Sequence, residues 1–108
     1  MDIVIGAKNF KLTPAINEYV NEKVGKLAHF WGEIIRAHVE LSTARLKTEG
    51  DVSHVHVRLE VPGPDLEAEA DSSEMYSAID IVLPKLEKQI AKARGKAQGR
   101  RRSIKSKL

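Results

Sequence analysis

Basic side chains gather toward one end of this chain, at a spacing that suits the binding of phosphate groups. Residues 1–71 hold 8 Lys/Arg and 12 Asp/Glu, a net charge of −4, whereas residues 72–108 hold 10 Lys/Arg and 3 Asp/Glu, a net charge of +7. At about 100° per residue, four lysines share one ridge of a predicted helix, and three arginines follow them. These candidate RNA-binding cations are Lys85, Lys88, Lys92 and Lys96, then Arg100, Arg101 and Arg102. A sorted row of cations indicates an anionic partner, and nucleic acid is the commonest large one.

A second group of cations lies on an earlier predicted helix. Lys23 and Lys26 flank its apolar stripe on the same side as Tyr19. A single surface lysine more often only contacts solvent than binds a phosphate. The aligned row of lysines on the later helix is therefore stronger evidence for RNA binding than Lys23 or Lys26 alone. Phosphate contacts carry no base sequence, and only 5% of the residues are aromatic and able to stack on bases. We therefore expect recognition of a folded RNA by its shape.

Histidines supply the main alternative, which is a metal-dependent enzyme. His38, His54 and His56 occupy the polar positions of predicted strands, near Glu40 and Glu60. On exposed strands, the H-x-H pattern is weak evidence for a metal site. Neither a glycine-rich phosphate loop nor a nucleophile–base pair accompanies it. The chain also has no cysteine, which excludes disulfides, thiol nucleophiles and Cys-ligated metals. We predict no enzymatic activity, no catalytic residue, no metal and no cofactor.

The hydrophobic periodicity predicts an α+β fold with the order β-α-β-β-β-α. Strands are expected near residues 2–5, 35–42, 54–61 and 66–71, because apolar and polar residues alternate there or form a short β-branched run. Helices are expected at 14–28 and from a capping box at Asp71 and Glu74 onward. The predicted inward residues of the second strand are Ile35, Ala37, Val39 and Leu41. Pro84 should kink the second helix without ending it.

These elements predict a four-stranded sheet with both helices on one face and a polar opposite face. A right-handed crossover through the first helix makes the first strand parallel to the second. Residues 1–96 are expected to form one domain, and residues 97–108 a basic, flexible C-terminal tail. The sequence contains neither a signal-peptide pattern nor an apolar stretch of membrane-spanning length, so we expect a soluble cytoplasmic protein.

Two adjacent motifs in the second predicted helix resemble a known signature. Residues 74–80 read E-M-Y-S-A-I-D and residues 85–90 read K-L-E-K-Q-I. They resemble the D-M-Y-A-A-I-D and K-L-E-R-Q-L of the bacterial ribosome hibernation-promoting factors, also called ribosome-associated inhibitors. The resemblance covers residues 1–96 and includes residues 19–27 with Phe30, residues 61–63 and residues 66–70. The departures are Glu74, Ser77 and Pro84, and Pro84 directly precedes Lys85.

The resemblance implies a fold similar to double-stranded-RNA-binding domains and a ribosome-binding function. It implies a short-form factor that binds the small ribosomal subunit (16S rRNA in 30S and 70S particles) at the decoding region. There it blocks mRNA and A- and P-site tRNA and inhibits translation under stress or in stationary phase. Carried over by position, the rRNA-binding candidates are Lys23, Lys26, Tyr76, Lys85, Lys88 and Lys92. We expect a monomer without membrane or small-molecule partners; a general double-stranded-RNA-binding module remains the alternative.

Overall fold

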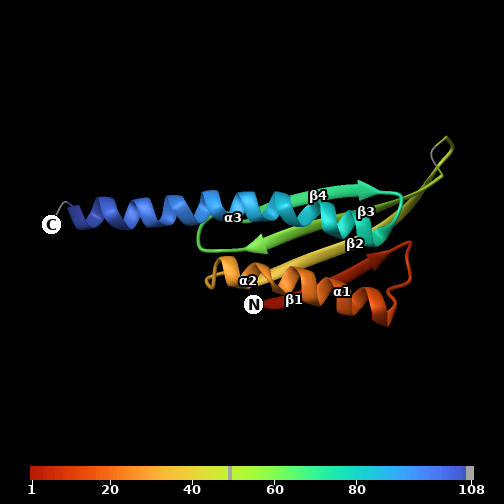
Figure 1. The fold of residues 1–108 in the computed structure, drawn as a ribbon, viewed down its shortest axis with the longest axis horizontal. Helices are drawn as coiled ribbons and strands as arrows, with labels where there is room; N and C mark the ends of the chain where they lie inside the picture. Colours follow the sequence, from red (N-terminus) through yellow and green to blue (C-terminus); the bar gives the residue numbers. More distant parts are fainter. Residues whose placement is uncertain (49, 107–108) are drawn as a thin grey trace.

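The computed structural model describes the backbone of residues 1–48 and 50–106, and side chains as far as residue 96. A four-stranded sheet carries its helices on one face, and the last helix extends well beyond the sheet (Figure 1). The elements are β1 (Asp2–Lys8), α1 (Pro14–Gly25), α2 (Leu27–Phe30), β2 (Arg36–Leu46), β3 (Gly50–Glu60), β4 (Leu66–Ser72) and α3 (Met75–Ser106). The α+β prediction and its β-α-β-β-β-α order are confirmed, with α2 as a short addition.

The strands lie in the order β1-β2-β3-β4. β1 is parallel to β2, as the crossover rule predicts, and the other two pairings are antiparallel. β2 and β3 pair along their full length, from Arg36 with Glu60 to Leu46 with Gly50. Because β1 pairs only as far as Ser42 and β4 begins to pair at Ser53, the end of this hairpin projects past both edge strands (Figure 1).

α1 begins where the sequence predicts, because the Thr13 side chain accepts a hydrogen bond from the Ile16 amide (3.2 Å). Pro14 follows in the first turn, where its missing N–H group would have no acceptor within the helix. Its apolar stripe is buried against the sheet. The helix ends at Gly25, and the last residues of the predicted span form the separate helix α2, whose Leu27 is buried.

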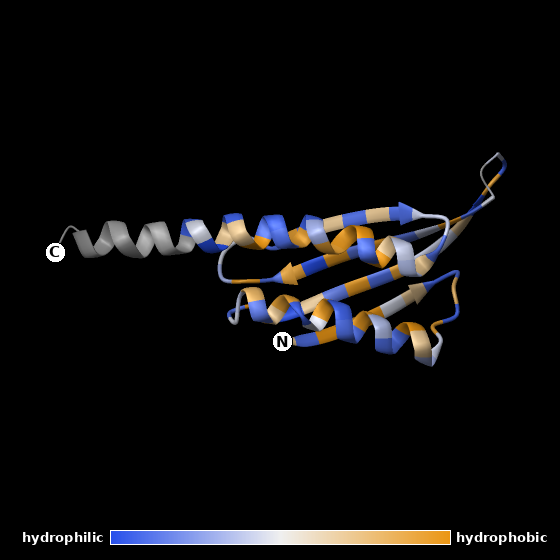
Figure 2. Ribbon diagram, in the orientation of Figure 1, coloured by the Kyte–Doolittle hydropathy of each residue, from blue (hydrophilic) through white to orange (hydrophobic). Residues whose placement is uncertain are grey.

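The core lies between the sheet and the helices, and alternate bands of hydrophobic and hydrophilic residues run along the strands (Figure 2). Ala37, Val39 and Leu41 point inward as predicted. The prediction for Ile35 is wrong: its side chain is 58% exposed and Ile34 is buried instead. The alternation starts only at Arg36, after a turn in which the Ile34 amide bonds to the Trp31 carbonyl.

α3 passes through Pro84, so the prediction that the helix does not end there is confirmed. The predicted capping box is wrong, because Asp71 belongs to β4 and the Ala78 amide bonds to the carbonyl of Glu74. The backbone stays helical to Ser106, past the predicted end, since Ala, Lys and Arg all favour helix even without an apolar stripe. The side chains of residues 97–106, and all of residues 107 and 108, lie outside the described part of the chain, so the flexible tail stays a prediction. Within the described residues, no helix is both long and apolar enough to cross a membrane.

Candidate nucleic-acid interface

One flank of α3 lies along the outer edge of the sheet, where β4 leaves backbone groups without a strand partner. The Lys85 ammonium donates to the Glu69 carbonyl at 2.9 Å, and the Gln89 side-chain amide donates to the Glu67 carbonyl at 2.5 Å. Both carbonyls belong to β4, so α3 covers an edge that would otherwise be open to pairing with another strand. These bonds also fix the rotation of α3 about its axis.

The lysines predicted to form a ridge do share one side of α3. Lys85, Lys88, Lys92 and Lys96 are exposed and span about 80° of the helix circumference at 3.6 residues per turn. We call these four residues the α3 ridge. Ile81, which is 44% exposed, projects on the same side. No salt bridge joins any member of the ridge to an acid in the described part of the chain. Lys88, Lys92 and Lys96 are therefore free to meet an external anion, whereas the Lys85 ammonium also bonds to the Glu69 carbonyl.

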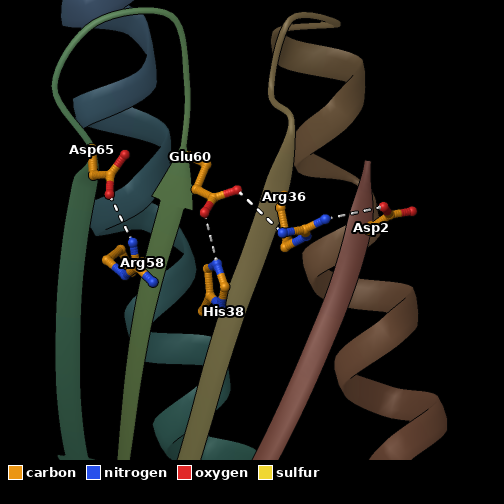
Figure 3. Close-up of polar contacts among 6 residues, drawn as sticks. All are labelled: Asp2, Arg36, His38, Arg58, Glu60 and Asp65. Carbon is orange, nitrogen blue, oxygen red and sulfur yellow. Dashed lines mark hydrogen bonds and ion pairs between the residues drawn. The ribbon is translucent and has the colours of Figure 1, made fainter.

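The arginines on the open face of the sheet are bound differently, because Arg36 and Arg58 each have an acidic partner. Arg36 lies 3.9 Å from Asp2 and 3.8 Å from Glu60, and His38 lies 3.1 Å from the same glutamate (Figure 3). Arg58 pairs with Asp65 at 2.8 Å at the far end of this row (Figure 3). The charges of Arg36 and Arg58 are therefore neutralised by neighbouring carboxylates.

The remaining strand histidines also contact acids on the neighbouring strand. His54 pairs with Glu69 at 3.1 Å and with Asp71, and His56 lies 3.7 Å from Glu67. Only His54 and Asp71 are directly opposite each other in the strand register; the other two contacts are diagonal. Among the described residues, no three His, Cys, Asp or Glu side chains are grouped so that they could hold a metal ion.

A second cluster, which the sequence does not predict as a unit, joins α1 to the other flank of α3. The Tyr19 hydroxyl donates to Asp80 Oδ1 at 2.5 Å. Its ring meets Tyr76 edge-on, with centroids 4.9 Å apart, and Lys23 Nζ lies 5.4 Å from the Tyr19 centroid. The hydrogen bond to Asp80, followed by partial burial and the nearby negative charge, raises the pKa of Tyr19 to about 12. Tyr19 is therefore a neutral donor that ties the two helices together.

The structure divides the predicted rRNA-binding residues into two surfaces. At about 100° per residue, Tyr76 lies roughly 160° around α3 from Lys92, so Lys23 and Tyr76 are on the α1 side and the α3 ridge is on the β4 side. Lys26 is exposed beside α1 and lies 4.0 Å from Glu22. The predicted arginines Arg100, Arg101 and Arg102 have side chains outside the described part of the chain. The candidate residues whose side chains are described therefore do not form a single continuous cationic face.

The same fold occurs in solved proteins of similar sequence. A ribosomal subunit interface protein from Coxiella burnetii superimposes with a TM-score of 0.78 and 25% identity, over 88% of this chain and 99% of that chain. The N-terminal domain of Protein Y from Thermus thermophilus gives a TM-score of 0.71 and 26% identity, over 83% of this chain and 96% of that chain.

Relatives of known name agree with the structural matches. The ribosome hibernation promoting factor of Escherichia coli K12 is 30% identical over 96 residues, which cover 89% of this chain and 96% of that protein. The ribosome hibernation promotion factor of Deinococcus radiodurans is 33% identical over 88 residues, 82% of this chain and 46% of that protein. That of Bacillus subtilis is 34% identical over 97 residues, 89% of this chain and 50% of that protein.

This chain therefore spans about half the length of the Deinococcus and Bacillus proteins and nearly all of the E. coli protein. The family described as Sigma 54 modulation protein / S30EA ribosomal protein matches residues 3–98, which include every strand and most of the long helix. The resemblance found in the signature motifs is confirmed: this chain belongs to the Sigma 54 modulation protein / S30EA ribosomal protein family, the family of the ribosome hibernation factors.

Proposed function

We propose that this protein binds the small ribosomal subunit at the decoding region, through 16S rRNA in 30S and 70S particles. It blocks mRNA and A- and P-site tRNA there and inhibits translation in the cytoplasm under stress or in stationary phase. The observation that carries the proposal is the α3 ridge, a row of unpaired lysines on the fold of a non-enzymatic ribosome hibernation factor family. The mechanism is steric: the folded domain occupies the space that mRNA and tRNA need.

The separation of basic and acidic residues onto different surfaces determines how the domain faces the rRNA in this proposal. Each ridge lysine that neutralises a phosphate releases condensed counterions, which favours binding. The open face of the sheet carries acids such as Glu67, Glu69 and Asp71, which repel phosphate. The rRNA therefore meets the helices, and the open face points away from it. Lys23, Lys26 and Tyr76 add contacts on the α1 side of α3, and Arg100, Arg101 and Arg102 add contacts beyond the domain.

Sucrose-gradient sedimentation of ribosomes with added protein, paired with a translation assay, tests the proposal. We expect co-migration with 30S and 70S particles and inhibition of translation. The matched variants are Lys88→Ala on the α3 ridge, which weakens both effects, and Lys8→Ala on β1, which changes neither. Absence of the wild-type protein from every ribosomal fraction at low salt contradicts the proposal.

The same experiment separates the alternative, a general double-stranded-RNA-binding module. The α3 ridge consists of lysines, and lysine–phosphate contacts carry no sequence information, so naked duplex RNA is the relevant competitor. Under the ribosome proposal, duplex RNA displaces the protein from 30S subunits only at a large excess. Comparable affinity for the duplex and for 30S subunits favours the general module.

A further inference from the structure

A hollow of about 340 Å³ lies between the β3–β4 loop and the part of α3 that carries the last two ridge lysines. Its apolar walls are Pro62, Pro64 and Leu66 on one side and Ala93 on the other. This volume is at the lower end of the range for small-molecule pockets, so it suits one small flat group and not a large ligand. The hollow is continuous with the proposed rRNA-binding surface, because Lys92 and Lys96 line both.

The polar groups at this hollow are cations and an amide. Lys92 and Lys96 are four residues apart and so neighbour each other on α3, and neither forms an ion pair with a described acid. Gln89 also lines the hollow, and the bond from its amide nitrogen to Glu67 fixes its orientation. Its side-chain carbonyl is left to accept a hydrogen bond. A ligand that matches all three features has a flat body, a donor on its edge and a phosphate group.

We propose that this hollow accepts one unpaired nucleotide of the rRNA, with the base against the apolar walls and its phosphates on Lys92 and Lys96. The proposal rests on the proposed function and adds to it a reason why the protein would select a particular place on an RNA. The ridge lysines cannot distinguish one stretch of backbone from another, whereas a base can enter the hollow only where it is unpaired and unstacked.

A tethered nucleotide fits this site better than a free one does. Free mononucleotide binding would have to offset the full loss of translational and rotational freedom with a few contacts in an open hollow. A nucleotide within rRNA is held near the hollow by the other phosphate contacts of the α3 ridge, so its base enters at a high effective concentration.

Filling the hollow without changing charge tests the proposal. Ala93→Leu places a larger side chain inside it, and leucine is a good helix former. Ala91→Leu is the matched control, since residue 91 is exposed on α3 and does not line the hollow. We expect Ala93→Leu to weaken 30S binding about tenfold, because it removes the contact of one base with the hollow. The salt dependence should not change, since no phosphate contact is lost.

Chemical probing of 16S rRNA bases gives a second readout. Wild-type protein and Ala91→Leu should both protect one additional base from modification, and Ala93→Leu should leave it reactive. Titration of the free protein with AMP should show no saturable binding at micromolar concentrations. If Ala93→Leu unfolds early in a thermal melt, Leu66→Phe fills the hollow from the opposite wall and should give the same results.

The outcomes separate this inference from the function on which it rests. If wild-type protein does not bind 30S subunits, the proposed function fails. If wild-type protein binds, and Ala93→Leu binds equally well with the same base protection, only the nucleotide site is overturned. Tight saturable binding of AMP also overturns it, because the hollow would then be a site for free nucleotides.

Discussion

Removal of one ridge lysine should change the salt dependence of ribosome binding by a calculable amount. The log–log slope of affinity against salt is about −0.9 per neutralised phosphate on a duplex. The five candidate lysines that have no acidic partner, Lys23 and the α3 ridge, give a slope of about −4.5. Between 50 and 200 mM KCl, affinity should then fall about 500-fold. Lys88→Ala should make the slope shallower by about 0.9. The ratio of wild-type to variant affinity should therefore fall about 3.5-fold between 50 and 200 mM KCl.

The assay is equilibrium binding of fluorescently labelled protein to purified 30S subunits at four or more salt concentrations. Lys8→Ala removes the same charge from β1 and controls for net charge, so its slope should match that of wild type. Thermal melts establish that both variants are folded. A wild-type slope near zero refutes phosphate binding by the ridge as a whole. An unchanged slope for Lys88→Ala, with the wild type still near −4.5, refutes the role of Lys88 alone.

Four further predictions concern stability, measured by urea unfolding. Tyr19→Phe removes the hydroxyl that donates to Asp80 and should cost about 0.5–1.5 kcal/mol. The wild type should also lose stability between about pH 10 and 12, because the pKa of Tyr19 is raised to about 12 when folded and the unfolded tyrosine ionises near 10. Thr13→Ala removes the N-cap of α1 and should cost about 1 kcal/mol. Leu59→Ala, in the core, should cost about 2–5 kcal/mol, whereas Val4→Ala on the exposed face should cost little.

Each of these predictions has a result that contradicts it. Equal alkaline profiles for wild type and Tyr19→Phe would mean that the hydroxyl is not protected in solution. Unchanged unfolding of Thr13→Ala would mean that water replaces the cap without loss. Equal costs for Leu59→Ala and Val4→Ala would contradict the assignment of inner and outer sheet faces.

The sheet was predictable because the alternation of polar and apolar residues that defines its two faces can be read from adjacent positions in the sequence. Val39 and His38 differ in polarity, and a strand turns successive side chains to opposite faces, so two neighbours are enough to orient it. The errors occur where a turn interrupts the period, as at Ile35, or where a residue suits two roles, as at Asp71. Asp71 could cap a helix by its type, yet β4 holds it opposite His54 and the strand pairing prevails. The helical end of α3 was missed because it has no apolar stripe to reveal it.

The candidate site was predictable only in part, for the same reason. The α3 ridge could be predicted from the spacing of its lysines within a single helix. The bond between Tyr19 and Asp80 joins residues 61 positions apart, and the hollow brings the β3–β4 loop against α3. Neither arrangement leaves a pattern in a single sequence, because each depends on how α1 and α3 pack on the sheet.

The division of the cations between two flanks of α3 has a geometric consequence for binding. Lys88 lies about 120° around α3 from Tyr76, and Lys23 lies on the neighbouring helix α1. If Lys23 and Lys88 both contact rRNA, the bound RNA surface must extend across both helices. The double variant Lys23→Ala/Lys88→Ala should then lose the sum of the two single losses in binding free energy, because separate phosphates do not couple. A double variant no weaker than Lys88→Ala alone would place the RNA on the ridge side only and leave the Tyr19–Tyr76 cluster as a structural tie between the helices.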